Sequence, residues 1–319
     1  MAGEQARNAA AATAAVTATT PVAAATARAR RRRGRIVQQV LVYLAVALVV
    51  FCVLAPYGWM VSGSFKEILE LQASDVTVPE QVPTWIPRNP TLRNYRDVNR
   101  VVPMFRYFKH SIVISVGSMI VSSLLSLMAA YALSRFRFRG REVYTVSVLA
   151  TQMLPGILFL IPYYLVFTTI SRSTGLPLRD TYWGMIFTYT SFALPFSIVM
   201  LRSYLNGIPL EIDEQAMIDG CTRGGALWRV VVPLATPGIV AVAIYSFIMA
   251  WNEVLFASVL TGRATRTVAV GIMDFVTTSR ANWGGMMAAC VVISIPVLVL
   301  FTAMQRYIVE GLIAGATKG

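Results

Sequence analysis

One acidic side chain, Glu253, lies well inside a long apolar run, in the sequence Ala-Trp-Asn-Glu at residues 250–253. If that run crosses a bilayer, the carboxylate must face a helix bundle or a wet cavity, because lipid exposure of a charge is costly. Three chemistries suit it: a hydrogen bond to a neighbouring helix, a contact with a polar solute, or a proton relay. Trp251 and Asn252 could stack on and hydrogen-bond to a polar ring. The sequence thus indicates a candidate solute path at Trp251, Asn252 and Glu253.

Patterns typical of catalysis are missing from the rest of the sequence. The single histidine, His110, starts an apolar run without a partner in sequence, and is interpreted as a boundary residue. There is no H-E-x-x-H pair, no G-x-S-x-G elbow and no G-x-x-x-x-G-K-[ST] phosphate loop. Cys52, Cys221 and Cys290 lack metal-ligand spacing. We expect no catalytic residue, no metal and no ATPase site in this chain.

The most distinctive polar stretch is the loop at residues 205–235. Pro209 is expected to start a short helix whose first turn carries Glu211, Asp213 and Glu214, where acids complement the helix dipole. Gly220 is expected to end it, as glycine commonly does. Residues 222–231 can form a second short helix before Pro233. A compact helical knob of this kind suits docking into a groove of a partner protein. An amphipathic hairpin lying on the membrane would carry more basic residues.

The surrounding composition predicts a membrane protein with several spans. Apolar residues make up 56% of the 319 residues and charged residues 13%, against about 25% charged in an average soluble chain. The net charge of +13 is concentrated beside apolar runs, at residues 28–35 and 135–141. Such clusters are typical of cytosolic loops under the positive-inside rule. This distribution argues against a nucleic-acid partner and for the lipid bilayer.

Six apolar runs are long enough to span a bilayer. They lie near residues 40–60, 111–134, 143–169, 182–204, 236–260 and 284–306. The first is longer than a signal-peptide core and is expected to stay in the protein. The sequence therefore predicts an all-α polytopic fold with a disordered cytosolic segment at 1–36, a six-span domain at 37–306, and a tail at 307–319. Both termini are expected in the cytosol.

The spans are expected to pack as a bundle rather than act as anchors. Prolines are expected to interrupt four of them: Pro155 and Pro162 in the third, Pro195 in the fourth, Pro237 in the fifth and Pro296 in the sixth. The second span carries small residues every three or four positions, which allow helices to approach closely. These are Ser115, Ser118, Ser122, Ser126 and Ala129. A transporter, a channel or a membrane enzyme would satisfy this pattern.

The loop at 205–235 resembles the EAA loop of inner-membrane subunits of ATP-binding-cassette (ABC) importers, whose pattern is E-A-A-x3-G-x9-I-x-L-P. The positions in register are Glu214, Ala216, Gly220 and Pro233. Gln215 stands at the second position, and valines replace the isoleucine and leucine. By this resemblance the residues that contact an ATPase would be Glu211, Glu214, Gln215, Ala216, Asp219, Gly220 and Pro233.

Further segments resemble the MalG-type permeases of the carbohydrate-uptake group, over residues 37–319. They are residues 90–95, 129–140, 194–196, 251–252 and 306–319. The resemblance implies an ABC type I permease fold and half of a translocation path for a sugar, such as a di- or oligosaccharide. It also implies a second, MalF-like permease, two copies of a cytosolic ABC ATPase that binds ATP and Mg, and an extracytoplasmic sugar-binding protein. The chain itself would bind no cofactor.

The resemblance also extends to the tail and the outer loops. The tail would reach the ATPase, with Gly315 and Lys318 as contacts. The outer loop 262–283 would touch the binding protein, with Arg280 and Trp283 as candidates. A bacterial plasma membrane is implied, and the Ala/Arg bias fits a high-GC genome.

Two alternatives stay open. Glycerol phosphates are carried within the same group, although an anion path would favour basic residues inside the spans. A self-contained, proton-coupled secondary transporter could use Glu253, but it would leave the knob at 211–233 without a role, and no paired repeat is evident.

Overall fold

The computed structural model of the chain describes residues 21–71, 84–277 and 280–316. Within these ranges the backbone is almost wholly helical, apart from a small antiparallel hairpin of β1 (Val276–Thr277) and β2 (Arg280–Ala281). Five described helices are long and apolar enough to cross a membrane, and a bent helix pair makes a sixth if counted as one span. The predicted all-α polytopic fold class is confirmed.

The chain divides into two compact units, Met1–Trp59 and Met60–Gly319. The described part of the first unit belongs to α2 (Pro21–Ser64). Its residues from Ile36 to Leu54 are all exposed within this chain, which suits a helix surrounded by lipid. The helix begins at Pro21, inside the segment 1–36 expected to be disordered, because alanine and arginine are strong helix formers. Residues 1–20 lie outside the described residues.

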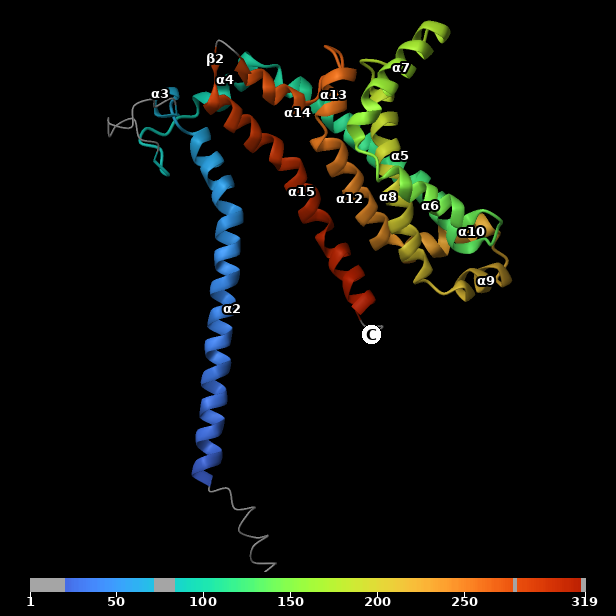
Figure 1. Ribbon diagram of the computed structural model, residues 1–319, viewed down its shortest axis with the longest axis horizontal. Helices are drawn as coiled ribbons and strands as arrows, with labels where there is room; N and C mark the ends of the chain where they lie inside the picture. The colour runs from blue at the N-terminus through green and yellow to red at the C-terminus, as the bar shows by residue number, and fades with distance from the viewer. Residues whose placement is uncertain (1–20, 72–83, 278–279, 317–319) are drawn as a thin grey trace, which may run out of the picture. The chain divides into compact units, whose positions relative to one another are not determined.

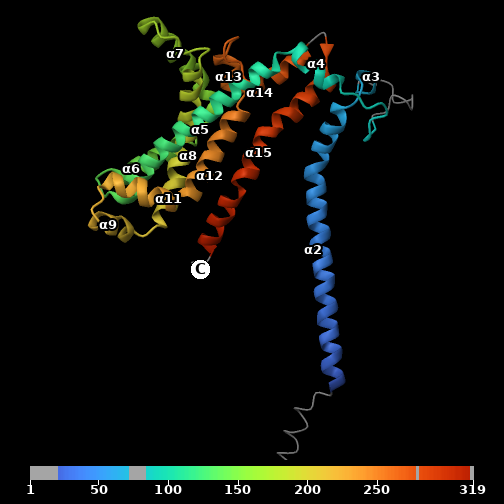
Figure 2. The same cartoon turned by 180° about the vertical axis from the view of Figure 1, so that it is seen from behind.

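The second unit is a bundle of four long helices (Figures 1 and 2). They are α5 (Met104–Arg135), α8 (Tyr182–Asn206), α12 (Thr236–Asn252) and α15 (Trp283–Ala316). Helix α5 packs against both α8 and α12, and α12 also packs against α15. The predicted small-residue stripe is confirmed on the buried face of α5 in Ser115, Ser118, Ser122 and Ser126, although Ala130 is buried there rather than Ala129.

The third predicted span, 143–169, is not one helix. It divides into α6 (Arg141–Thr151), a 3₁₀ turn η2 (Gly156–Phe159) and α7 (Leu160–Thr174). The break ends at Pro155, which disfavours helix in the residue before it and lacks an N–H. Pro162 lies in the first turn of α7, where an N–H has no intrahelical partner, so it interrupts nothing.

The fifth predicted span, 236–260, is also divided, but proline is not the cause. Pro237 lies in the first turn of α12, where it fits a helix start, and this corrects its expected role as an interruption. The break falls instead at residues 253–254, before α13 (Leu255–Leu260). Pro195 and Pro296 lie within the expected spans, but α8 and α15 each continue through their proline as one helix, so the interruption expected there is not observed.

Short elements at one end of the bundle complete the fold (Figure 1). They are α3 (Ile68–Leu71), α4 (Arg93–Val101), α14 (Val268–Gly271) and the 3₁₀ turn η4 (Ile272–Phe275). One apolar core joins α4, α14, α5, α12 and α15; its residues include Val98, Val268, Met104, Trp251 and Ala288. Another, built from Leu127, Leu201, Leu205 and Val231, lies toward the end that carries the 205–235 loop.

Candidate functional site

The loop between α8 and α12 folds into the predicted helical knob. Its first helix, α9 (Leu210–Ile218), begins directly after Pro209, with Glu211 and Asp213 in its first turn. Acidic side chains there face the positive end of the helix dipole. The predicted start at Pro209 is confirmed, whereas Glu214, expected in the first turn, lies just after it.

Gly220 ends α9 as predicted, through two backbone hydrogen bonds that close its last turn. Gly220 has φ of +90°, which glycine adopts without strain. Its N–H donates to the Met217 carbonyl at 3.1 Å, and the Cys221 N–H donates to the Ala216 carbonyl at 3.0 Å. This pair of bonds is a Schellman motif, which satisfies carbonyls left unpaired at the helix end. The turn fixes where the chain leaves α9.

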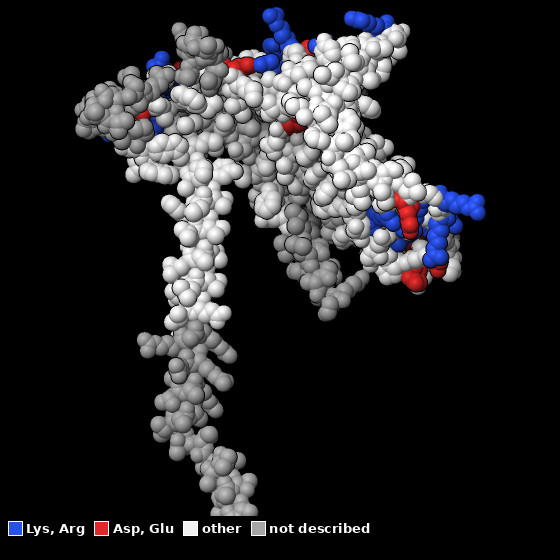
Figure 3. All heavy atoms as spheres, viewed as in Figure 1, with Lys and Arg blue, Asp and Glu red and all other residues white. Residues whose placement is uncertain are grey.

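Most of the residues predicted to contact an ATPase lie on the open surface of the knob. The exposed ones are Glu211, Glu214, Gln215, Asp219, Gly220 and Pro233. Ala216 is buried, so it packs α9 against the rest of the knob. Figure 3 shows acidic and basic side chains gathered at the end of the bundle that carries α9 and α10. The exposed face of α9 is free to meet a partner.

The second half of the knob is a longer helix than predicted. It runs through α10 (Arg223–Ala226), the π-helical turn η3 (Leu227–Val231) and α11 (Val232–Leu234). The Thr222 hydroxyl accepts from the Gly225 N–H at 3.1 Å and so caps the start. This helix meets α12 at a bend of 79°. The knob therefore returns to the bundle through a sharp corner.

Asp213, expected from the sequence only as an acid in the first turn of α9, has a tertiary contact that the sequence did not predict. Its side chain is 4% exposed and forms an ion pair with Arg135, with Nη2 and Oδ2 2.9 Å apart. The Tyr131 hydroxyl donates to the other carboxylate oxygen at 3.0 Å. Both partners lie on α5, about 80 residues away in sequence. The available signal was its helical spacing from Ala216, which puts both on the buried face of α9.

A cavity of about 700 Å³ lies where α7, α8, α12 and α13 meet. Its walls carry five aromatic rings, Phe159, Tyr163, Tyr189, Phe192 and Phe256. Its polar side chains include Gln152, Ser191 and Glu253, while no Lys or Arg is among its lining residues in the described chain. Such a site, apolar with a few polar groups, is typical of a small-molecule pocket.

Glu253 lies at the break between α12 and α13 rather than inside a continuous span. Its carboxylate accepts from the N–H groups of Phe256 at 2.8 Å and Ala257 at 3.0 Å, which caps α13. The Tyr189 hydroxyl on α8 donates to it at 2.9 Å. The hydrogen bond to a neighbouring helix, one of three roles open from the sequence, is thus observed. The carboxylate also faces the cavity.

The two neighbours of Glu253 are placed differently. Trp251 is 2% exposed and packs in the core, stacked on Phe247 with ring centroids 5.5 Å apart and edge-on to Phe108. It does not line the cavity. Asn252 is exposed, and its amide donates to the Ile248 carbonyl at 3.1 Å. The structure therefore brings only Glu253 of this predicted trio into the cavity.

Residues 122–313, more than half of the chain, match the family described as "Binding-protein-dependent transport system inner membrane component". The chain belongs to this family. It is a multi-pass permease, a component of a transport system rather than an enzyme.

Similar proteins agree over nearly their whole lengths. The permease is 36% identical over 288 residues to the inner membrane ABC transporter permease protein YcjP of Escherichia coli, covering 89% of this chain and 98% of that one. It is 34% identical to the diacetylchitobiose uptake system permease protein DasC of Streptomyces coelicolor, covering 83% and 91%. It is 36% identical to the trehalose transport system permease protein SugB of Mycobacterium tuberculosis, covering 85% and 95%.

A solved structure shares the fold. It is the crystal structure of a bacterial ABC transporter involved in the import of the acidic polysaccharide alginate. The TM-score is 0.71 at 21% sequence identity, covering 86% of the permease and 98% of that chain. This likeness shows the permease fold alone.

At the other end of the permease, Asp180, which the sequence did not flag, organises the start of the loop at 262–283. Its carboxylate accepts from the N–H groups of Gly262, Ala264 and Thr265 at 2.7–3.1 Å and from the Thr265 hydroxyl at 2.8 Å. Partial burial by itself raises the pKa of Asp180, but these hydrogen bonds outweigh it and hold the pKa below its ordinary 3.8. His110 lies nearby as a boundary residue, with Nδ1 3.1 Å from the Arg266 carbonyl oxygen.

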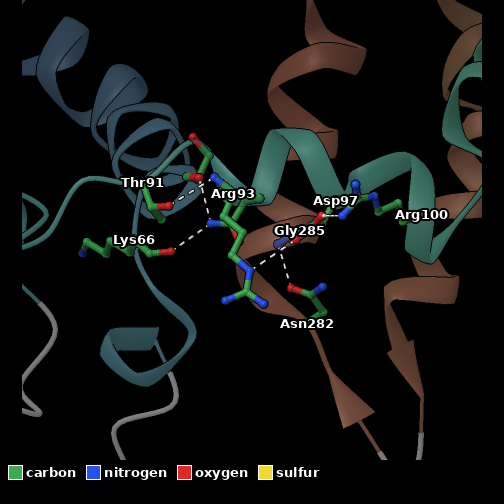
Figure 4. A network of polar contacts seen from close by, with 9 residues as sticks. Lys66, Thr91, Arg93, Asp97, Arg100, Asn282 and Gly285 are labelled. Atoms are coloured by element: carbon green, nitrogen blue, oxygen red, sulfur yellow. Dashed lines mark hydrogen bonds and ion pairs between the residues drawn. The ribbon is translucent and has the colours of Figure 1, made fainter.

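The segment at residues 90–95, part of the family resemblance, ties α4 to its surroundings (Figure 4). The Asn94 amide donates to the carbonyls of Ser64 at 2.9 Å and Lys66 at 2.8 Å. On the exposed face of α4, Asp97 pairs with Arg93 at 3.3 Å and Arg100 at 3.0 Å. These contacts fix the loop that precedes α5.

The remaining predicted contacts are placed only in part. Trp283 is exposed at the start of α15, as a partner contact requires. Arg280 lies in β2, and its side chain is not among those described. Helix α15 continues to Ala316, so the tail expected at 307–319 is helical through Gly315. Lys318 lies outside the described residues.

Proposed function

We propose that this permease forms half of the translocation path of an ABC importer for a sugar, delivered by an extracytoplasmic sugar-binding protein. The family supplies the dependence on a binding protein. The relatives named for diacetylchitobiose and trehalose uptake support a carbohydrate, and a di- or oligosaccharide in particular. The cavity supports a neutral sugar, because its described lining includes no Lys or Arg and one carboxylate, Glu253. Asn252 lies outside the cavity and stays a proposed contact of the sugar on its path.

The coupling site is proposed to be the exposed face of α9. The observation that carries this is a short helix held rigidly to the bundle on one side and open on the other. On its open side are Glu211, Glu214 and Gln215, and Asp219 and Gly220 follow at the turn. In the proposed complex these residues seat in a cleft of an ABC ATPase. Gly315 and Lys318 of the tail make a second contact.

The proposed assembly contains this permease, a second MalF-like permease and two copies of the ATPase. ATP and Mg bind to the ATPase, and this chain binds no cofactor and has no ATPase site of its own. Both termini are proposed to lie in the cytosol of a bacterium, because six arginines precede the first span. The Ala/Arg bias supports a bacterium of high GC content. That orientation puts the knob in the cytosol, where an ATPase can reach it.

The variant Glu214→Arg tests the coupling site. It reverses one exposed charge on α9, so we expect sugar-dependent ATP hydrolysis by the purified complex to fall at least tenfold, with the permease still inserted. The matched control is Glu142→Arg, which makes the same reversal at an exposed position on α6 near the same end. Normal hydrolysis in Glu214→Arg would contradict the assignment.

Affinity purification of the tagged permease from its native membrane, in mild detergent, tests the assembly. We expect a second permease and a P-loop ATPase to co-purify, with the ATPase in about twofold excess over the permease. Transport in liposomes by the chain alone, without ATP, would favour a secondary transporter instead. The hydrogen bonds that Glu253 makes to α13 and Tyr189 give it a structural role and leave that alternative without support from the site.

A further inference from the structure

Arg135, the last residue of α5, joins three elements at the base of the knob. Its Nη2 lies 2.9 Å from Asp213 Oδ2 on α9. Its Nη1 donates to the carbonyl of Leu205, at the end of α8, at 3.4 Å and to that of Ile208 at 3.1 Å. One guanidinium thus holds the ends of α5 and α8 and the start of α9 together.

This contact is buried, which makes it a rigid link rather than a surface ion pair. The side chains of Arg135 and Asp213 are 7% and 4% exposed. A buried charge that loses its partner is strongly unfavourable, whereas an exposed pair contributes little. The Tyr131 hydroxyl, one turn before Arg135, adds a second bond from α5 to Asp213. Asp213 therefore cannot move away from α5 without leaving a charge unpaired.

The apolar contacts of the knob lead to the same helix. Leu227 and Val231 from the second half of the knob share a core with Leu127 and Ala130 of α5. Beside the ion pair, the Ser134 hydroxyl of α5 donates to the Asn206 side chain at the end of α8 at 2.9 Å. Both halves of the knob thus rest on the last three turns of α5, which is distant from them in sequence.

The covalent route from α9 forward to α12 is less direct. After α9 the chain turns at Gly220, passes the π-helical turn η3, and bends by 79° before α12. Each of these is a point where a displacement of α9 can be absorbed by a change of angle. The buried contact to α5 has no such joint.

We propose that Arg135 and Asp213, supported by Tyr131, are positioning residues that make α5 move with α9. The displacement of α9 by the ATPase then reaches the second span directly, through side chains, and not only the spans that flank the loop. Because α5 packs along α8 and α12, its movement reaches the walls of the cavity. This inference rests on the proposed role of α9 as the ATPase contact.

The test uses the complex purified from native membranes, with Cys52, Cys221 and Cys290 replaced by serine. Spin labels are placed at two exposed positions, Phe105→Cys at the start of α5 and Leu176→Cys after α7. Mg-ATP with vanadate traps the ATPase, and the distance between the labels is measured with and without it. In the parent protein we expect trapping to change that distance.

Asp213→Asn replaces the carboxylate by an amide of the same shape and leaves Arg135 without its ion pair. We expect the ATPase to co-purify and hydrolyse ATP within about twofold of the parent rate, while the change in label distance is lost. Arg135→Lys keeps the charge but has one nitrogen in place of the two that contact Asp213 and the carbonyls, so we expect a change in label distance between those of the parent and Asp213→Asn. The matched controls are Glu142→Gln and Arg139→Lys, at exposed positions near the same end.

An unchanged distance response in Asp213→Asn would overturn the inference. So would loss of the ATPase from this variant alone, because the cluster would then build the docking surface rather than transmit its movement. Failure of the parent chain to bring down an ATPase would instead contradict the proposed function, which the Glu214→Arg experiment addresses separately.

Discussion

At the scale of single residues, carboxylates in this permease act mainly as acceptors that hold elements in place. Glu253 caps α13 and bonds to α8, Asp180 gathers an outer loop, and Asp213 pairs with α5. Glu253 and Asp180 accept from backbone N–H groups at a helix start or a turn, whereas Asp213 accepts from the Tyr131 hydroxyl and pairs with Arg135. Removing such an acceptor leaves donors unsatisfied, which costs more than the bond itself contributed.

Glu253→Gln is expected to destabilise the permease without changing the energy source of transport. The amide oxygen of glutamine can accept from one N–H of α13, but its NH2 group then lies against the other N–H, which is also a donor. The unpaired donors lower the free energy of unfolding by about 1–3 kcal/mol. Thermal unfolding in detergent measures this, with the exposed Glu67→Gln as control. Uptake should stay dependent on ATP and insensitive to a protonophore. If a protonophore instead inhibits uptake by the parent permease, and Glu253→Gln abolishes that uptake, the proton-relay interpretation is restored.

Asp180→Asn is expected to loosen the loop at 261–265 at neutral pH by about 1–3 kcal/mol, because four hydrogen bonds lose their acceptor charge. Asp180 has φ of +54°, which asparagine also adopts readily, so the backbone is not strained by the change. Faster tryptic cleavage at Arg263 measures the local effect. Equal cleavage rates would show that the carboxylate does not hold the loop.

The pH dependence of this effect has a definite sign. The pKa of Asp180 in the fold lies below 3.8, so its stabilisation is complete at any pH above that ordinary value. It is lost only as the pH falls through the lower pKa of the folded state. The difference in melting temperature between Asp180→Asn and the parent should therefore be constant near neutral pH and narrow only below 3.8. A difference that narrows near pH 6 would contradict this origin.

The sequence predicted residue roles only where the partner is near in the chain. Glu253 stands out because its neighbours are apolar. By contrast, Asp213 finds its partner Tyr131 82 positions away, and Asp180 reaches Gly262 over the same separation. Neither pairing has a local pattern, so both depend on how helices pack.

At the scale of elements, the knob depends on one backbone position. The Schellman turn after α9 needs a positive φ at Gly220, and nothing lies within 4 Å of where its Cβ would be. A side chain there meets no neighbour, and its cost is purely conformational. The position therefore isolates the turn from packing.

Gly220→Ala is expected to destabilise the knob by about 1–2 kcal/mol, the cost of placing an L-residue in the left-handed region. The control is Gly224→Ala, which also has open space but lies in α10 with an ordinary φ. There alanine should be neutral or stabilise by about 0.5–1 kcal/mol. Trypsin cleavage at the exposed Arg223 compares the two variants. Similar cleavage rates for both would argue against the turn as the determinant.

Hydropathy located the spans but not where they break. It merges α6 with α7 and α12 with α13, because each break is short and holds a single strongly polar residue, Gln152 or Glu253, within a long apolar run. Pro155 is a local signal that marks the first break correctly. At the second break the cap that Glu253 makes on α13 is local, but its bond from Tyr189 of α8 is a tertiary contact that no window of sequence contains. By contrast, Pro209 and Gly220 begin and end α9 through their own backbone preferences, so the sequence alone predicted both positions.

At the scale of the whole molecule, Lys, Arg, Asp and Glu side chains gather at the two ends of the second unit, and few of them lie on the surface between (Figure 3). Helix α12 has 17 residues, which rise about 26 Å at 1.5 Å per residue. This is short of a hydrocarbon core of about 30 Å. The six residues of α13 are needed to complete the crossing. The knob and the loop after α13 should then lie on opposite sides of the membrane.

This arrangement is tested with two single cysteines in a background free of the native ones. Gly224→Cys lies on the knob and Arg263→Cys on the loop after α13, and both positions are exposed. The cells are treated so that a membrane-impermeant maleimide reaches the outer face of the plasma membrane while that membrane stays closed. The maleimide should then label Arg263→Cys at once. It should label Gly224→Cys only after the membrane is opened. Labelling of both from one side would mean that α12 and α13 do not cross together. The reverse order would mean that the arginines before the first span do not set the orientation, and the knob could not reach a cytosolic ATPase.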